Sequence, residues 1–197
     1  MSSHALRRAI VVVLLAAGCL AIVPGVAGAG VKAKYRSEYK ARLKMLDTAF
    51  QGYVDGYGHN KDTCRQVADD MKDLLDDPDQ LLIARQGCQK IYDSQKDGPD
   101  ASADSYAGMI SRFRMGWARY FGSPAEQKRF KARCDRLKQY SGQAIRADNF
   151  INNAWKDLSL DPPDFEFASV NIAFGDNDLA LGQKGYKTWM AKLRAML

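Results

Sequence analysis

The chain of 197 residues has little histidine and lacks the short motifs that mark common active sites. Of its two histidines, only His59 lies beyond residue 30, whereas zinc hydrolase sites usually take two or three. A Gly-x-Ser-x-Gly nucleophile elbow, a phosphate-cradling glycine-rich loop and a Cys-x-x-Cys pair are all absent from the sequence. We therefore expect no catalytic residues, no metal ligands and no cofactor.

A hydrophobic run long enough to cross a membrane is also missing. The uncharged apolar run at residues 9–23 is shorter than the roughly 20 residues that a transmembrane helix needs. Arg7-Arg8 precedes this run, and the small residues 27–29 follow it, an order typical of a secretory signal peptide. We predict that residues 1–29 are removed by cleavage before Gly30. The mature chain is then exported to the periplasm or outside the cell and has no transmembrane helix.

The leader contains a second candidate cleavage site. Leu15-Ala16-Ala17-Gly18-Cys19 resembles a lipobox, the motif at which bacterial lipoproteins are cut and lipidated on the cysteine. An envelope-anchored lipoprotein carrying lipid on Cys19 is therefore the alternative to export without an anchor.

The charge of the chain is mild and lies in alternating blocks. The leader holds two of the 29 Lys and Arg residues and no acid, so the mature chain keeps 27 against 23 acidic residues, a formal charge of +4. This excess is too small for a typical nucleic-acid binder. The alternation predicts helix faces of opposite sign packed beside one another. The strongly basic block 112–138 is the candidate surface for an anionic partner, through Arg112, Arg114, Arg119, Lys128, Arg129, Lys131 and Arg133.

Apolar residues recur at steps of three and four along most of the mature chain. This spacing is typical of helices that pack nearly antiparallel. We predict one all-α domain over residues 30–197, an antiparallel bundle of about five to six helices. The stripes are Tyr39, Leu43, Leu46, Phe50, Tyr53 and Tyr57; Cys64, Val67, Met71 and Leu74; Leu81, Ala84, Cys88 and Ile91; Tyr106, Ile110, Phe113, Trp117 and Tyr120; and Phe130, Cys134 and Leu137.

Turn and capping residues predict where these helices begin and end. Pro can occupy the first turn of a helix, and Ser or Asp can cap its N-terminus. We expect the first helix to end at Gly56–Asn60 and the second to begin at Asp62. Asp77-Pro78 separates the second helix from the third, and Gly98-Pro99 closes the third before Ser102 caps the fourth. Ser123-Pro124-Ala125-Glu126 predicts a capping box.

The last 40 residues show a different pattern. Prolines 162 and 163 interrupt the helical spacing, and Phe165-Glu166-Phe167 alternates as a strand does. We predict a short extended segment near residues 164–174, a turn at residues 175–178, and a final amphipathic helix over residues 186–197.

Three cysteines remain after the leader: Cys64, Cys88 and Cys134. Each lies on an apolar stripe, and a tight turn near Asp77 would pack the helices that carry Cys64 and Cys88 against each other. Because exported proteins meet an oxidising compartment, we predict a Cys64–Cys88 disulfide with Cys134 as a buried thiol. The alternative is that all three stay reduced as small core residues.

These features favour an exported, non-enzymatic binding module. Its partner is an unidentified protein or an anionic envelope component rather than nucleic acid. The alternative is a small exported hydrolase that uses Asp55 and Asp62 near His59 as acid–base groups. A ligand groove between the first and fourth helices is a further hypothesis. It would lie beside aromatic side chains, where Gly52 and Gly56 would also let another helix approach closely.

Overall fold

The computed structural model describes residues 30–197, and this part of the chain is almost entirely helical. Its one β-type pairing is an isolated bridge between Val31 and Phe121. Among the described helices, none is both long and apolar enough to span a membrane. The predicted leader, with Cys19, lies outside the described residues. The elements are η1 (Ala33–Tyr35), α2 (Arg36–Lys72), α3 (Pro78–Gln95), α4 (Gly98–Trp117), η2 (Ala118–Tyr120), α5 (Pro124–Arg146), α6 (Asp148–Leu158) and α7 (Phe165–Arg194).

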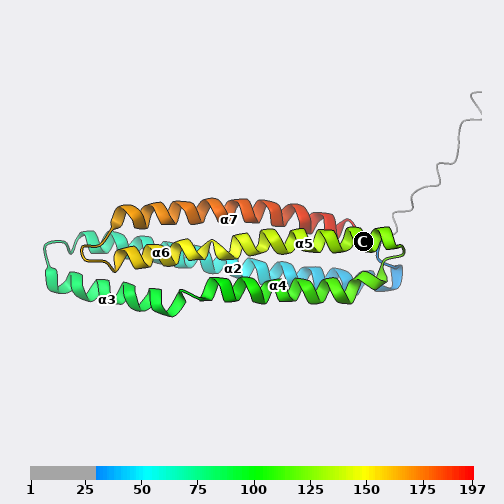
Figure 1. Ribbon diagram of the computed structural model, residues 1–197, viewed down its shortest axis with the longest axis horizontal. Coiled ribbons are helices and arrows are strands. Elements are labelled where there is room, and N and C mark those ends of the chain that lie inside the picture. Colours follow the sequence, from blue (N-terminus) through cyan, green and yellow to red (C-terminus); the bar gives the residue numbers. More distant parts are fainter. Residues whose placement is uncertain (1–29) are drawn as a thin grey trace, which may run out of the picture.

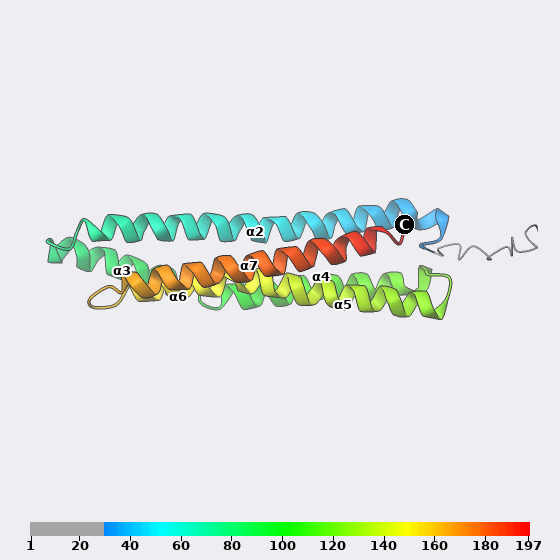
Figure 2. The same cartoon turned by 90° about the horizontal axis from the view of Figure 1, so that it is seen from above.

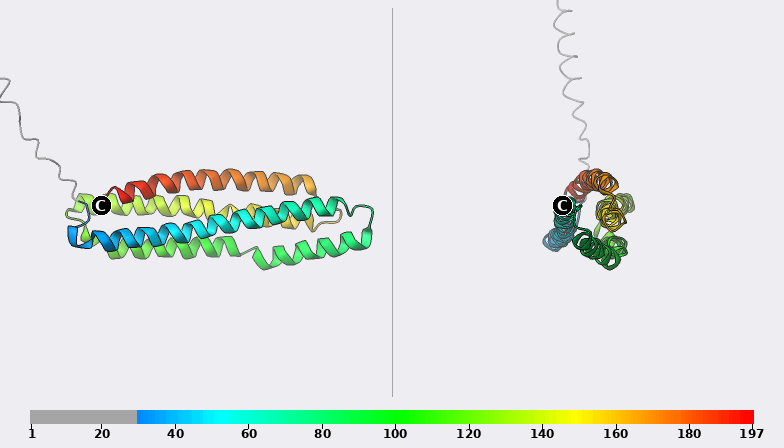
Figure 3. Two further views of the ribbon diagram at one scale, coloured as in Figure 1. Left: turned by 180° about the vertical axis from the view of Figure 1, so that it is seen from behind. Right: turned by 90° about the vertical axis from the view of Figure 1, so that its left-hand side faces the viewer.

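The six α-helices form four antiparallel rods. α3 continues into α4 after a short break, α5 continues into α6, and α2 and α7 each span the bundle (Figures 1 and 2). Seen end-on, the rods surround one central seam (Figure 3). The prediction of an all-α antiparallel bundle is confirmed. The predicted number of five to six packed helices is too high, because the six α-helices pack as only four rods.

The first rod, α2, accounts for part of the difference between the predicted and the observed number of packed helices. The predicted helix end at Gly56–Asn60 is wrong, because α2 runs without a break for 37 residues. Glycine in a helix costs about 1 kcal/mol relative to alanine but does not forbid one. The buried stripe that runs from Tyr39 to Met71 packs along the whole length of α2. Tertiary packing therefore outweighs the weak local propensity at these glycines.

Two predicted helix starts are confirmed by their caps. Asp77 caps α3, because its carboxylate accepts a hydrogen bond from the Gln80 amide at 3.1 Å. Ser123 and Glu126 form the predicted capping box at the start of α5, where the Glu126 side chain accepts from the Ser123 amide at 3.0 Å. The fourth helix, however, begins at Gly98 and not at a cap on Ser102.

The predicted extended segment at residues 164–174 is wrong, because α7 is helical from Phe165 onward. Asp164 accepts a hydrogen bond from the Phe167 amide at 2.9 Å and starts the helix. The turn expected at residues 175–178 is likewise helical. A Cβ at Gly175 would lie 3.2 Å from the Ala147 carbonyl oxygen, so this glycine serves close packing of α7 and not a turn.

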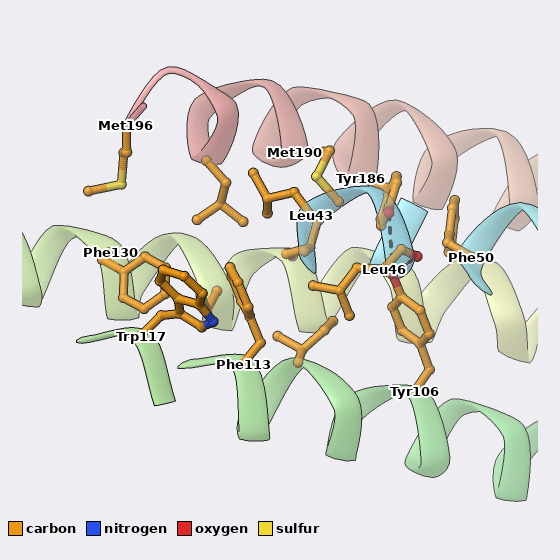
Figure 4. Close-up of a cluster of buried hydrophobic side chains, with 14 of the residues drawn as sticks. Leu43, Leu46, Phe50, Tyr106, Phe113, Trp117, Phe130, Tyr186, Met190 and Met196 are labelled. Carbon is orange, nitrogen blue, oxygen red and sulfur yellow. Dashed lines mark hydrogen bonds between the residues drawn. The ribbon is translucent and has the colours of Figure 1, made fainter. Parts of the chain in front are cut away.

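The core consists of two clusters along the seam. The larger is rich in aromatic residues and fills the part of the bundle that contains both ends of the described chain (Figure 4). Here Phe50 stacks on Tyr186 with ring centroids 3.7 Å apart, and the Tyr106 hydroxyl donates to the Leu46 carbonyl at 2.8 Å. The smaller cluster contains Cys64, Cys88 and Trp155 and fills the other part. The predicted stripes supply just over half of the buried residues of the larger cluster and about a third of those of the smaller one.

Close packing of α7 against α5 predicts opposite effects for two glycine substitutions. A Cβ at Gly182 would lie 2.5 Å from the Ala144 nitrogen, whereas a Cβ at Gly56 would meet nothing within 4 Å. Gly182→Ala should therefore lower the free energy of unfolding by about 2 kcal/mol. Gly56→Ala should raise it by up to about 1 kcal/mol through helix propensity. Urea denaturation measures both values, and equal effects of the two substitutions would contradict this packing.

Candidate functional site

The predicted basic residues gather at one end of the bundle. Arg112 and Arg114 lie in α4, Arg119 lies in η2, and the other four lie in the first half of α5. The end of α4 and the start of α5 meet where the chain also ends at Leu197 (Figure 1). The seven side chains therefore occupy one end of the molecule, spread over two rods.

The basic character of this end extends to all four rods. We define the basic half as residues 30–54, 98–146 and 181–197, and the acidic half as residues 55–97 and 147–180. The basic half carries 20 Lys and Arg against 6 Asp and Glu, whereas the acidic half carries 7 against 17. Exposed cations come from every rod of the basic half, for example Lys40, Arg112, Lys131 and Lys187.

From the sequence, we expected the alternating charge blocks to form helix faces of opposite sign. In the structure they form two oppositely charged ends of the bundle instead. Successive rods run in opposite directions, and the sign of the charge changes near the middle of each rod. Blocks of the same sign consequently lie side by side. The spacing of the blocks matches the length of the rods, but which blocks meet depends on how the rods are arranged.

Every acidic residue of the basic half is already engaged within the molecule. Glu126 belongs to the capping box, and the other five accept ion pairs from four arginines. Among these pairs, Arg114–Asp135 is 2.6 Å long and Arg194–Asp47 is 2.7 Å. Within the described residues, 16 cations of the basic half then have no carboxylate partner: Lys32, Lys34, Arg36, Lys40, Lys44, Arg112, Arg119, Lys128, Arg129, Lys131, Arg133, Arg136, Lys138, Lys184, Lys187 and Lys192.

The seven predicted residues are not equally available to a partner. Arg114 is paired with Asp135, and Arg133 donates to the backbone carbonyl of Lys192. Arg119 lies over the ring of its neighbour Tyr120, with 5.0 Å between the guanidinium carbon and the ring centroid. The remaining members, Arg112, Lys128, Arg129 and Lys131, are exposed and form no ion pair among the described residues.

The residues of the hydrolase hypothesis lie on α2. Asp55, His59 and Asp62 are four and three positions apart and therefore share one exposed face of the helix. Within the described residues, no side-chain hydrogen bond or ion pair joins these three, and Asp55 instead accepts from Gln51 at 2.8 Å. Cys64 is buried and does not lie on that face. The structure thus aligns these groups without assembling them into a hydrogen-bonded set.

The predicted Cys64–Cys88 disulfide is not present in the described structure. All three cysteines are free and buried. Cys64 and Cys88 belong to the same core cluster, but the Cys88 thiol donates to the Met71 sulfur at 3.7 Å and is not bonded to Cys64. Burial raises the pKa of Cys64 to about 12 and that of Cys88 to about 11, and it also raises the pKa of Cys134. All three thiols are therefore protonated and shielded at neutral pH.

Burial of the cysteines predicts a two-step thiol count. In the folded protein, an aromatic disulfide reagent at pH 8 should label none of the three thiols within the time in which a free cysteine reacts completely. After unfolding in guanidinium chloride without reductant, it should label all three. A count of one in the unfolded protein would show that the disulfide forms. Rapid labelling of the folded protein would contradict the burial.

Neither a metal centre nor a known relative points to a function. Among residues 30–197, no group of three or more His, Cys, Asp or Glu side chains is arranged to hold a metal ion. No protein-family model matches the chain, no curated protein matches it, and no solved structure matches it. What the molecule can do therefore has to follow from its own side chains.

Proposed function

We propose that the protein is an exported, non-enzymatic binding module whose basic half docks on the anionic lipid surface of the cell envelope. The observation that carries this proposal is the set of 16 unpaired cations at one end of the bundle. A Lys or Arg close to an anionic bilayer contributes about 1 kcal/mol to binding. Only a few of the 16 need to reach the surface for stable association.

The charge distribution also favours one orientation on the bilayer. The cations surround all four rods of the basic half, while the acidic half carries 17 Asp and Glu against 7 Lys and Arg. If the whole bundle lay flat on the bilayer, it would bring both the basic and the acidic half to the lipid surface. An end-on orientation keeps the acidic half beyond the Debye length, which is about 8 Å at physiological ionic strength. The 37 residues of α2 span about 55 Å, so the acidic end is then far from the lipid.

The start of the described chain lies at the same end. Val31 donates a backbone hydrogen bond to Met196 at 2.9 Å, so both ends of the described chain are in the basic half. Under the alternative of lipidation on Cys19, the anchor would precede this end, and the lipid and the cations would act on the same bilayer. Export is part of the proposal, and lipidation on Cys19 is its alternative.

Charge reversal at matched positions tests the proposal. Lys128→Glu with Lys131→Glu changes the basic half, and Lys90→Glu with Lys156→Glu makes the same change of net charge in the acidic half. All four lysines are exposed, and none forms an ion pair among the described residues. Binding is measured by co-sedimentation with vesicles of phosphatidylcholine mixed with phosphatidylglycerol, and with vesicles of phosphatidylcholine alone.

The wild-type protein should bind only the anionic vesicles, and added salt should weaken the binding. The basic-half variant should bind at least roughly 30-fold more weakly, because two lost attractions are worth about 2 kcal/mol. The acidic-half variant should bind like the wild type. Equal losses in the two variants would show that net charge alone acts. No binding to anionic vesicles would overturn the lipid proposal in favour of an acidic protein partner.

A further inference from the structure

A cavity of about 490 Å³ lies near the middle of the bundle, away from the basic end. Two rods are interrupted beside it: α3 ends at Gln95 before α4 begins at Gly98, and α5 ends at Arg146 before α6 begins at Asp148 (Figure 1). Both breaks face the same part of α2, so residues from all five helices line the cavity. Its volume lies within the range of small-molecule sites.

Two glycines of α2 keep this space open. Gly52 and Gly56 line the cavity, and a Cβ at either position would meet nothing within 4 Å. The sequence had suggested that these glycines admit a neighbouring helix at close range. That role belongs instead to Gly182 and Gly175 of α7, where a Cβ would clash with its neighbours. At Gly52 and Gly56 the missing side chains leave volume that no other part of the described protein fills.

A hydrogen-bonded set of polar side chains forms one wall of the cavity. The Asn60 amide donates to Asp148 Oδ1 at 3.0 Å and to Gln95 Oε1 at 3.1 Å. The Asn60 carbonyl oxygen accepts from Trp155 Nε1 at 2.9 Å. These contacts tie together α2, α3 and α6. They hold the Asp148 carboxylate in a fixed position in the wall.

Asp148 is a carboxylate without a counter-charge. No Lys or Arg lines the cavity, and among the described residues none forms an ion pair with Asp148. Burial raises the pKa of Asp148, against the opposing effect of the Asn60 hydrogen bond. A half-buried anion that lacks a cationic partner is unfavourable, and a ligand that brings the missing positive charge would relieve this cost.

The remaining wall supplies apolar and aromatic surface. Tyr53, Tyr57 and Trp155 line the cavity together with Ile91 and Pro99. Aromatic rings attract a cation that lies over their faces and also pack against an apolar body. The lining holds a carboxylate and three aromatic rings, its one basic residue is His59, and it has no Lys or Arg, so it favours a cation over an anion.

From this geometry we infer that the cavity binds a small organic amine whose protonated nitrogen pairs with Asp148 and whose apolar body contacts the aromatic wall. This site lies where the basic and acidic halves meet and contains none of the 16 unpaired cations, and its ligand has the opposite charge. The two sites therefore can be tested independently of each other.

Two arylalkyl amines, phenethylamine and tryptamine, are the probes for this site. Phenethyl alcohol and phenylacetate provide the neutral and anionic counterparts of similar size. The readout is the indole N–H resonance of Trp155 in an NMR titration, because this group donates to the amide that holds Asp148. The indole resonances of Trp117 and Trp189, which do not line the cavity, serve as internal controls.

Three variants separate charge, space and folding. Asp148→Asn removes the charge, whereas Asp97→Asn removes a nearby exposed charge that does not line the cavity. Gly56→Leu fills the cavity and also raises helix propensity, so it should fold at least as well as the wild type. Each variant is first compared with the wild type by thermal unfolding.

Both amines should shift the Trp155 resonance in a saturable way, at least tenfold more tightly than the alcohol, and phenylacetate should give no response. Asp148→Asn should weaken amine binding at least tenfold, Gly56→Leu should abolish it, and Asp97→Asn should leave it unchanged. Equal affinity for amine and alcohol, or full amine binding by folded Asp148→Asn, would overturn the inference. The absence of a saturable response to either amine would also overturn it.

Discussion

The apolar seam between the four rods is the interaction on which the rest of the structure depends. It holds four rods side by side although their neighbouring ends in the basic half repel one another, since this half carries 20 Lys and Arg against 6 acids. Exposed like charges repel by modest amounts in salt, whereas each buried Leu, Ile or Phe side chain contributes roughly 1.5–3 kcal/mol. The larger, aromatic-rich core cluster lies in the basic half, so the strongest burial stabilises the most strongly repelling end.

Helix class, core residues and two of the caps were predictable from the sequence because each depends on local spacing. The stripe from Tyr39 to Tyr57 indicates a buried face whatever the neighbouring rod is. Asp77 and the Ser123–Glu126 pair act within one helical turn of their own amides. Such features need no knowledge of the tertiary structure.

The errors arose where tertiary contacts overrule local preference. Gly56–Asn60 reads as a helix end, but the rods packed along α2 keep it helical. Gly175 is typical of a turn in the sequence, but in the structure it lies within a helix, where Tyr57 and Ala147 leave no room for a larger side chain. The charged end and the central cavity were not predictable for the same reason. Each brings together residues from several rods, and only the antiparallel arrangement shows which blocks meet.

The two candidate sites divide the molecule in a consistent way. The basic half presents unpaired cations at one end, and the cavity lies where the charge changes sign along the rods, beside Asp148. A bundle that stands on its basic end would keep this cavity clear of the lipid and open to small molecules. Surface attachment and ligand capture would then proceed at the same time in one short protein.

The orientation on an anionic bilayer tests the central claim most directly. The buried native thiols allow a single fluorophore to be attached at Ala125→Cys in the basic half or at Leu75→Cys in the acidic half, both of which are exposed positions. Energy transfer to a membrane dye then measures the distance of each end from phosphatidylglycerol-containing vesicles. The charge segregation predicts strong transfer from residue 125 and weak transfer from residue 75. Equal transfer from both positions, or stronger transfer from residue 75, would contradict it.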